Sequence, residues 1–359
     1  MSEIDRVLNN CIECGLCLAE CDFLQKYCTS PKEIVLNYKE HGYSDALNIP
    51  YSCNICSLCK LRCPEGLDIG KMAIEMRQEM VEKGIGPLKQ HSTITEAQKF
   101  YVSDEFKVTI PASDKTVNLF FPGCSLSAYS PELVKNTYEY LKKKLPGTGI
   151  MMGCCGGPAY LTGDKKYYTH ISDDLAFEVK NLGVKQFIVA CPFCYGLLKQ
   201  HQPDLNPVSL YEVLNKIGVP VNNSQDKTFN IHDPCTARYE PEIQSSVRNI
   251  IEMTGNNVLE IKHNKEESHC CGMGGMVYVV DEELGKLKTK RTLDESDETI
   301  ITYCATCRET LQGQGGHVVH LLDLLFNPYP LDASKSPPKT AEDSKNNMKS
   351  LKNHFFLLE

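Results

Sequence analysis

The spacing of apolar residues changes near position 115 of the chain. In segments 31–42 and 69–83, apolar side chains recur at helical intervals, as Ile34, Val35 and Tyr38 illustrate. Farther along, short apolar runs alternate with helix-like segments. The runs span 117–121, 187–190, 229–231 and 299–303, and the helix-like segments span 131–145, 167–182, 208–217, 242–253 and 284–293. This pattern predicts an all-α N-terminal region, followed by an α/β region with largely parallel strands.

The spacing of the cysteines in the α/β region indicates an internal duplication. Cys124 precedes Cys235 by 111 residues, and Cys191 precedes Cys304 by 113 residues. Each copy ends in an apolar, helix-like stretch, from Val208 in the first copy and from Val319 in the second. We expect a protein of class α+β and α/β. Its expected domains are an all-α domain over 1–105, duplicated α/β domains over 106–225 and 226–328, and a flexible tail over 329–359.

Composition and charge exclude several classes of protein. The 359 residues are 42% hydrophobic and 23% charged, as in an ordinary globular protein. The net charge of −8 argues against a nucleic-acid partner, because phosphate binding needs clustered Lys and Arg. No run approaches the roughly 20 apolar residues of a membrane-spanning helix, and the N-terminus has no signal pattern. We therefore expect a cytoplasmic protein without a membrane span.

The most informative residue type is cysteine, because 18 of the 19 cysteines fall into four sets. Two sets, here called the ferredoxin runs, are Cys11, Cys14, Cys17 and Cys21, then Cys53, Cys56, Cys59 and Cys63. The other two, here called the pentads, are Cys124, Cys154, Cys155, Cys191 and Cys194, then Cys235, Cys270, Cys271, Cys304 and Cys307. Thiolates are soft ligands that select iron–sulfur clusters, zinc or copper(I). The odd total and a reducing cytoplasm argue against disulfides, and we expect the remaining Cys28 to be a small buried residue.

The ferredoxin runs have the spacing of bacterial ferredoxins, in which the fourth cysteine of each run binds the other cluster. This rule predicts one [4Fe-4S] cluster on Cys11, Cys14, Cys17 and Cys63, and a second on Cys53, Cys56, Cys59 and Cys21. The all-α domain over 1–105 is therefore expected to be a di-cluster, ferredoxin-like domain. Zinc usually takes two CxxC pairs, so three tandem cysteines in each run disfavour it. The first run departs from the ferredoxin pattern at Asp22, where proline is usual.

The pentads are placed where a parallel sheet binds its ligands. Cys124, Cys191, Cys235 and Cys304 each follow a predicted strand. Because open α/β sheets bind ligands beyond the carboxyl ends of their strands, the cysteines of each copy should converge on one crevice. The sequence Gly272-Met-Gly-Gly follows two cysteines and lacks the full dinucleotide fingerprint. We interpret it as a close backbone approach to a cluster.

The pentad pattern resembles the cysteine-rich CCG domain in the B-type subunit of heterodisulfide reductase, and the ferredoxin part resembles the C-type subunit. Their fusion on one chain looks like the D-type subunit of the membrane-linked reductase, over about residues 5 to 326. The resemblance implies that each complete pentad holds a noncubane [4Fe-4S] cluster, with zinc in the second copy as the less favoured alternative. It also implies that Cys154, Cys155, Cys270 and Cys271 serve disulfide chemistry.

The resemblance leads to two functional hypotheses. The first is a subunit of a reductase-like complex that accepts electrons from a flavin-containing partner subunit and reduces, or forms, a small thiol or disulfide substrate. Because no flavin or nicotinamide motif occurs in the chain, the donor should be a separate protein, which implies a hetero-oligomer. The second is an electron conduit between a flavin-dependent dehydrogenase of glycerol-3-phosphate, glycolate or lactate type and a quinone or another carrier.

Several other residues are candidates for roles near the clusters. His232, His269 and His320 could donate a hydrogen bond to a sulfur or a proton to a leaving thiolate, and His320 is the catalytic candidate. Tyr195 and Arg308 directly follow ligand cysteines, Arg238 lies three residues after Cys235, and all three could line an open face. In the tail, Met348, Leu351, Phe355 and Leu358 share one helical face. We expect this face to dock on a partner subunit, after a linker over 331–347.

Overall fold

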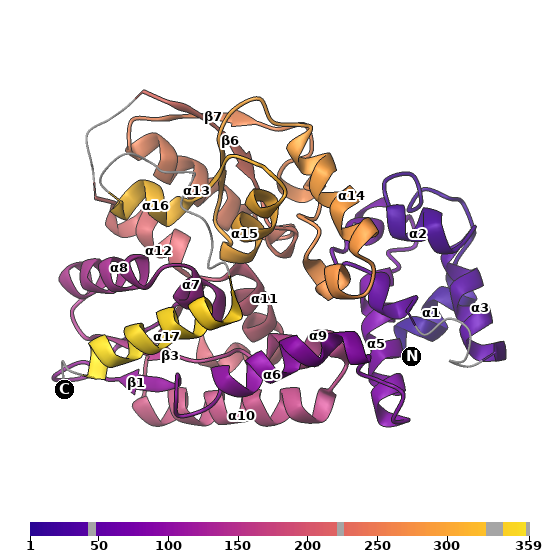
Figure 1. Ribbon diagram of the computed structural model, residues 1–359. Coiled ribbons are helices and arrows are strands. Elements are labelled where there is room, and N and C mark those ends of the chain that lie inside the picture. Colours follow the sequence, from indigo (N-terminus) through magenta and orange to yellow (C-terminus); the bar gives the residue numbers. More distant parts are fainter. Residues whose placement is uncertain (42–47, 221–225, 328–339, 357–359) are drawn as a thin grey trace.

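The computed structural model describes residues 1–41, 48–220, 226–327 and 340–356. The helices of residues 3–82 lie at one end of the molecule, and the two sheets with their helices form the rest, which also includes the helix of residues 92–101 (Figure 1). Among the described residues, no helix is long and apolar enough to cross a membrane.

The N-terminal region is helical, as predicted, and its described part up to residue 105 contains no strand. Its helices are α1 (Glu3–Asn10), α2 (Asp22–Tyr27), α3 (Pro31–His41), α4 (Leu58–Arg62), α5 (Ile69–Glu82) and α6 (Ser92–Tyr101), with the 3₁₀ turns η1 (Pro50–Ser52) and η2 (Lys89–His91). Ser2 and Asp68 begin α1 and α5 as N-caps, because their side chains accept hydrogen bonds from backbone N–H groups. Val7, Leu24 and Met76 are fully buried between these helices.

The first α/β module contains a five-stranded sheet. Its strands are β1 (Val108–Ile110), β2 (Asn118–Phe121), β3 (Thr148–Met152), β4 (Gln186–Val189) and β5 (Pro207–Ser209). Their order is β1-β3-β2-β4-β5, and only β1 runs antiparallel to its neighbour. The helices are α7 (Cys124–Tyr129), α8 (Pro131–Lys144), α9 (Gly157–Thr162), α10 (Lys165–Leu182), α11 (Pro192–His201) and α12 (Leu210–Ile217), with η3 (Pro203–Leu205). Every residue of β2 and β3 is buried, as expected for parallel strands covered on both faces.

The second α/β module repeats this arrangement. Its strands are β6 (Thr228–His232), β7 (Asn257–Glu260), β8 (Ile300–Thr302) and β9 (Val318–His320), all parallel, in the order β7-β6-β8-β9. Its helices are α13 (Pro241–Met253), α14 (Glu282–Leu293), α15 (Ala305–Gly313) and α16 (Leu321–Phe326), with η4 (Cys235–Ala237), η5 (Lys265–Glu267) and η6 (Gly274–Val279). The order of β6–β9 matches that of β2–β5, which confirms the predicted duplication.

The structure corrects the stretches that end the two copies. The segment from Val208 was predicted to be helical, but its first residues complete β5, and α12 begins only at Leu210. In the same way, β9 precedes α16 in the second copy. Ser209 and His320 both act as N-caps, so the two copies use the same strand-to-helix turn with different capping groups.

The two α/β modules share one hydrophobic core. Helix α12 of the first packs along α13 of the second, and Tyr211 donates a hydrogen bond to the Tyr303 carbonyl at 2.7 Å. Both tyrosines are fully buried, and their rings meet edge to face. The modules therefore behave as one packed unit, which fixes the position of one pentad relative to the other.

The C-terminal segment differs from the flexible tail and partner-docking element that the sequence suggested. Helix α17 (Ala341–Phe356) begins inside the expected linker and packs against α7 and α8 of its own chain. Met348, Leu351 and Phe355 are buried there, and Phe355 meets the Tyr138 ring at 5.4 Å. The predicted helical face is therefore confirmed, but its partner is this chain; Leu358 lies outside the described residues.

Candidate metal centres

The first ferredoxin site is a cavity lined by Cys11, Cys14, Cys17 and Cys63. The loop from Cys11 to Cys17 turns through left-handed backbone at Glu13 and Gly15, and this curvature aims three thiols at one point. Cys14 is exposed, whereas the other three are half-buried. The structure thus brings together the four cysteines that the ferredoxin rule assigned to one cluster.

The second ferredoxin site is a cavity lined by Cys21, Cys53, Cys56 and Cys59. Its loop has left-handed backbone at Ile55 and Ser57, and the Ile55 N–H donates to the Cys53 sulfur at 3.4 Å. Cys21 reaches this cavity from the end of the first run, so the two runs exchange their fourth cysteine. Cys270 of the second pentad lines the same cavity, which makes this site a neighbour of that pentad.

The first pentad gathers at the carboxyl ends of β2, β3 and β4. The Cys194 thiol donates to the Cys155 sulfur at 3.1 Å, and the Gly156 N–H donates to the Cys154 sulfur at 3.4 Å. Hydrogen bonds from Cys154 and Cys194 lower the pKa of Cys155 to about 6. Cys124, at the start of α7, completes the group by contact with Cys154.

The second pentad repeats this geometry after β6, β7 and β8. The thiols of Cys235 and Cys271 donate to the Cys270 sulfur, and the Gly272 N–H donates to it at 3.4 Å, so the pKa of Cys270 is held well below its usual range. Cys307 contacts both Cys271 and Cys304, which closes the set.

The two pentads lie side by side at the interface of the modules. Cys191 of the first pentad accepts hydrogen bonds from Cys194 and from Cys304 of the second pentad, which hold its pKa well below the usual thiol value. Next to this contact, the Thr306 hydroxyl donates to the Ser125 hydroxyl at 3.1 Å. One face of each pentad is therefore directed at the other.

Backbone contacts join the second ferredoxin site to the second pentad. The Asn54 side-chain amide donates to the carbonyls of Gly272 at 2.9 Å and Gly274 at 3.1 Å. Arg238 donates to the Cys56 carbonyl at 2.9 Å. The sequence predicted that the glycines after Cys271 permit a close approach to a cluster. The Cys53–Asn54 backbone approaches Gly274 and Gly275, and the Cys270 sulfur lies 2.9 Å from where a β-carbon of Gly274 would be.

These contacts place the four cysteine sets in a row. The order is the Cys11 site, the Cys21 site, the second pentad and finally the first pentad, so spatial order differs from chain order. Buried cations accompany the row: Arg77 donates to the Cys53 carbonyl at 2.9 Å, and Lys288 lines the Cys21 site. Such charges compensate the negative charge that a set of thiolates carries.

The donor sets fit iron–sulfur groups. Each ferredoxin site offers four thiols around one cavity, which is the ligand set of a [4Fe-4S] cluster. Each pentad offers five thiols in contact, one more than the four of a tetrahedral structural zinc site. All 18 cysteines of the four sets thus have a place in these centres, while Cys28 is half-buried and donates to the Leu24 carbonyl at 3.3 Å.

The three candidate histidines differ in their surroundings. The ring of His320 accepts the Leu322 N–H at 3.2 Å and donates to the Tyr303 backbone carbonyl, and burial lowers its pKa to about 3. These contacts give His320 a capping role and do not support the predicted proton transfer. His232 and His269 are buried near Cys270, and neither ring has a hydrogen-bond partner among the described residues. Both remain candidates for hydrogen bonds to a group held by the second pentad.

Tyr195, Arg238 and Arg308, which were expected to line an open face, are buried against other parts of the protein. Arg238 is buried and also donates to the Ser268 carbonyl at 2.7 Å. Arg308 is buried with its guanidinium 4.5 Å from the centre of the Tyr129 ring, and Tyr195 packs in the shared core under Lys199. None of the three lines an open face, so the structure corrects that expectation. Asn54 and Lys288 were missed, because nothing in the local sequence marks a contact with residues more than 200 positions away.

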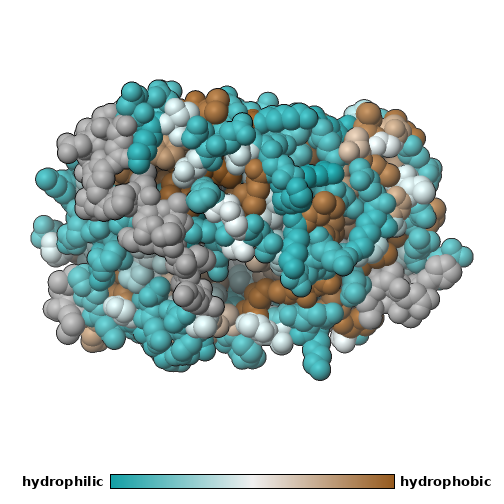
Figure 2. Space-filling model, turned by 45° about the horizontal axis from the view of Figure 1, so that its top comes forward, coloured by the Kyte–Doolittle hydropathy of each residue, from teal (hydrophilic) through white to brown (hydrophobic). Residues whose placement is uncertain are grey.

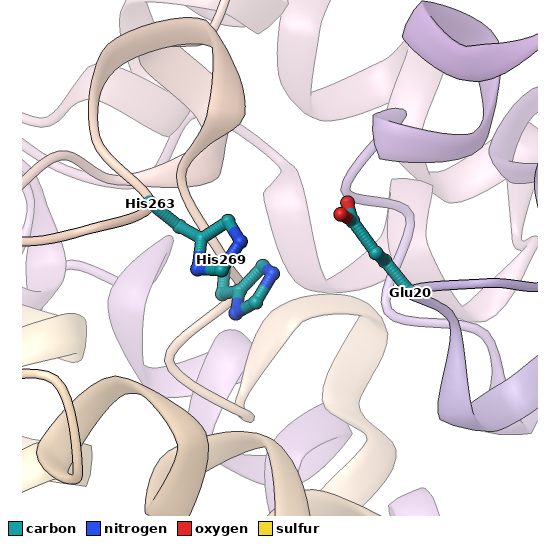
Figure 3. Close-up of side chains that lie close together, drawn as sticks. All are labelled: Glu20, His263 and His269. Atoms are coloured by element: carbon teal, nitrogen blue, oxygen red, sulfur yellow. The ribbon is translucent and has the colours of Figure 1, made fainter.

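A further group of possible ligands lies beside the second ferredoxin site. Glu20, His263 and His269 have ligand atoms within 4.8 Å of one another (Figure 3). The two imidazoles are stacked, with ring centres 4.0 Å apart and planes 19° from parallel. An ion about 2.0–2.1 Å from a nitrogen of each ring would lie far out of both ring planes, where no lone pair points. The His263 ring is hydrogen-bonded to Glu295, and Glu20 pairs with Arg62, so these side chains already have partners.

Comparison with known families agrees with this geometry. Residues 10–68 match the 4Fe-4S dicluster domain, and residues 118–199 and 229–312 each match the cysteine-rich domain CCG. Among solved structures, a hypothetical protein from Helicobacter pylori has a similar fold, with a TM-score of 0.54 at 10% identity over 89% of this chain and 70% of that one.

Curated relatives share most of this chain. An uncharacterized iron–sulfur protein of Methanococcus maripaludis is 26% identical over 84% of this chain, which spans 66% of that protein. The EtfAB:quinone oxidoreductase of Syntrophomonas wolfei is 26% identical over 72% of this chain, which spans 42% of it. The D-type subunit of the dihydromethanophenazine:CoB–CoM heterodisulfide reductase of Methanosarcina acetivorans is 24% identical over 85% of this chain and 88% of its own length. The chain is therefore an iron–sulfur protein built from a 4Fe-4S dicluster domain and two CCG domains, similar to the D-type subunit of heterodisulfide reductase.

Proposed function

We propose that this chain is the iron–sulfur subunit of a heterodisulfide-reductase-like complex, which takes electrons from a flavoprotein partner and uses them to reduce a small disulfide. The overall reaction adds two electrons and two protons to one disulfide and releases two thiols. When bound, the [4Fe-4S] groups of the ferredoxin sites would carry electrons, and those of the pentads would supply the iron that meets a substrate sulfur. The cytoplasm is the expected compartment.

The observation that carries this proposal is the unbroken row of four cysteine sets. The Cys21 site shares a cavity wall with Cys270, and Cys191 of the first pentad contacts Cys304 of the second. A row of this kind suits one-electron carriers, because each site has a neighbour on the way from the N-terminal helices to the first pentad. It also suits disulfide cleavage, because the two complete pentads face one another.

The ferredoxin end of the row has the surface that an electron donor needs. The Cys11–Cys17 loop exposes Cys14 and two apolar side chains, Ile12 at 63% and Leu16 at 54% exposure. Figure 2 shows hydrophobic residues on the surface at the end formed by the N-terminal helices. Exposed apolar side chains around a redox site are typical of a protein–protein contact, and here the partner would be the flavin-containing subunit.

The other end of the row is open toward solvent. A cavity of about 130 Å³ reaches Cys154 between β3 and α10, and its walls include Phe121, Met152, Tyr167 and Leu175. At its rim, Lys107 pairs with Glu178 at 2.7 Å and His170 lies 3.7 Å from Asp174. The largely apolar wall would exclude water from a thiol or disulfide that approaches the first pentad.

A second candidate function is supported by the relatives. The similarity to the EtfAB:quinone oxidoreductase favours an electron conduit between a flavin-dependent dehydrogenase and a quinone or another carrier. In that case the pentads would hold electron carriers and would not meet a disulfide.

Metal analysis after anaerobic purification tests the common part of both functions. Four [4Fe-4S] groups require about 16 irons per chain. About eight irons with one or two zincs would contradict iron–sulfur groups in the pentads.

A pair of cysteine variants then separates the two functions. Cys14→Ser should block electron uptake from the flavoprotein while disulfide reduction with a small artificial dye survives, because the dye can reach the later sites. Cys154→Ser should abolish disulfide reduction with either donor, with iron at the ferredoxin sites retained. Two results would favour the conduit. One is that Cys154→Ser reduces disulfides with the dye as fast as the protein without substitutions. The other is that the protein without substitutions reduces no disulfide that is tried.

A further inference from the structure

The first ferredoxin run ends in Cys21-Asp22, and the structure gives the aspartate a role that proline could not fill. Asp22 is 6% exposed, and its carboxylate lies 3.0 Å from the Lys288 ammonium and 2.6 Å from the Arg291 guanidinium. Both cations come from α14, which contacts α2 across the joint between the N-terminal helices and the second CCG module (Figure 1). The departure from the ferredoxin pattern therefore creates a buried charge group at this joint.

Lys288 is unusual among the lysines of the described chain in being nearly buried, with a side chain 7% exposed. It lines the cavity of the Cys21, Cys53, Cys56 and Cys59 site, and Cys270 of the second pentad lines the same cavity. One carboxylate, Asp22, serves two cations, so this group of three carries a net charge of +1. A buried ammonium needs compensating negative charge, and the thiolates of the adjacent site supply it.

We propose that Lys288 sets the reduction potential of the site formed by Cys21, Cys53, Cys56 and Cys59, and that Asp22 moderates its effect. The proposal rests on the proposed function, because it assumes that this site holds a [4Fe-4S] group. Reduction of such a group adds one negative charge, which a nearby cation in a poorly polarisable interior stabilises. Lys288 thereby raises the potential at the point where electrons leave the ferredoxin sites for the second pentad.

The alternative is that Lys288 and Asp22 only hold the two domains together. The two roles predict different signs for the shift in reduction potential when each residue is replaced. If the charges act on the potential, removal of the cation and removal of the carboxylate have opposite effects. If they act only through packing, both removals loosen the same joint and change the potential in the same direction, or leave it unchanged.

The experiment is an anaerobic redox titration of the full chain, followed by the paramagnetic resonance signals of its reduced ferredoxin sites. The signal that is lost or altered in Cys56→Ser identifies the site in question. Lys288→Met should shift its oxidised-to-reduced ratio about tenfold toward the oxidised form at a given potential, which corresponds to about 59 mV for one electron. Asp22→Asn should shift the ratio in the reduced direction, and Lys288→Arg, which keeps the charge, should stay near the unchanged protein.

Lys26 provides a matched control at the same joint. It extends from α2 to Asp281, the N-cap of α14, at 2.6 Å, but its side chain is 43% exposed. Lys26→Met removes an ion pair between the same two helices, and water screens its charge, so the potential should hardly change. Arg291 continues to pair with Asp22 in Lys288→Met, which keeps the carboxylate compensated and the joint closed.

The outcomes separate this proposal from the proposed function. An unchanged potential in Lys288→Met, or shifts of the same sign in Lys288→Met and Asp22→Asn, with both ferredoxin signals intact, overturns the role of Lys288 alone. If the protein without substitutions gives no paramagnetic resonance signal from the ferredoxin sites, or contains too little iron to fill them, the proposed function is overturned instead.

Discussion

At the scale of the residue, Gly275 shows how the absence of a side chain lets two cysteine loops meet. Its backbone is left-handed, with φ of +60°, and a β-carbon there would overlap the Cys53 carbonyl oxygen. Arg77 donates to the Gly275 carbonyl at 3.2 Å and to the Cys53 carbonyl at 2.9 Å, so one guanidinium holds both loops. Gly275 is therefore required both for its conformation and for the space it leaves.

Gly275→Ala should destabilise the chain far more than the same change at Gly183. Gly183 has nearly the same backbone, with φ of +63°, but no atom lies within 4 Å of its missing β-carbon. Gly183→Ala should cost about 1–2 kcal/mol, because alanine is strained in a left-handed backbone. Gly275→Ala adds a clash with backbone that cannot move freely, so its free energy of unfolding should fall by at least about 2 kcal/mol more.

Thermal unfolding of both variants, together with iron content, checks this prediction. Gly275→Ala should also lower the iron retained by the second pentad or the Cys21 site, while Gly183→Ala keeps the full complement. Equal losses of stability in the two variants would show that the Cys53–Gly275 contact does not constrain the fold.

Part of this residue-level detail could be predicted from the sequence. The cysteine spacing, together with the ferredoxin rule, predicted the exchange of Cys21 and Cys63 between the runs, and the structure brings each to the expected cavity. The contact between Asn54 and Gly272 could not be foreseen, because the two residues are 218 positions apart and belong to different domains. Contacts of this kind depend on how domains pack, which leaves no periodic trace in the chain.

At the scale of the element, the apolar runs predicted some strands and missed others, among them β1 and the fully buried β3. Strands β2, β4, β6 and β8 lie where apolar runs were found. Strands β5 and β9 are three residues long and lead directly into helices, so their apolar residues continued the helical pattern. Strand β7 was missed because it is mostly exposed at the edge of its sheet and lacks a continuous apolar run.

The C-terminal helix gives the prediction at this scale. Phe355 and Phe356 are neighbours on α17, but Phe355 is 1% exposed and Phe356 is 61% exposed. Phe355→Ala should weaken the docking of α17 on α7 and α8 by up to about 3–5 kcal/mol, limited by the free energy at which the helix detaches. Phe356→Ala should leave docking unchanged within about 0.5 kcal/mol.

Hydrogen exchange of the α17 amides measures this docking directly. Exchange should accelerate in Phe355→Ala and stay slow in Phe356→Ala, because only a detached helix of this length loses its protection. Helix α7 begins at Cys124, so a detached α17 should also make iron in the first pentad easier to remove by chelators. Slow exchange in both variants would show that α17 is held by contacts other than its apolar face.

At the scale of the whole molecule, Arg77 connects the three domains. Its guanidinium is fully buried and donates to four carbonyls: Pro50 at 2.9 Å, Cys53 at 2.9 Å, Leu161 at 2.6 Å and Gly275 at 3.2 Å. These acceptors belong to the ferredoxin domain, the first CCG module and the second CCG module. Burial lowers its pKa to about 10, which still leaves the group charged at neutral pH. Arg77 thus holds the Cys21 site against both modules.

Arg77→Met should separate the unfolding of the ferredoxin domain from that of the CCG modules. The methionine leaves buried carbonyls without a donor, each at about 1–3 kcal/mol, so the total loss should exceed about 3 kcal/mol. Arg62 is the matched control, because it also spans the joint, to Glu267, and pairs with Glu20 in its own domain, but its side chain is 31% exposed. Arg62→Met should cost no more than about 1 kcal/mol.

Differential scanning calorimetry should show one transition for the unchanged protein and Arg62→Met, and two for Arg77→Met. A single transition in Arg77→Met, at a temperature close to that of the unchanged protein, would mean that the ferredoxin and CCG domains are coupled by the pentad-side contacts of Asn54 and Arg238 instead.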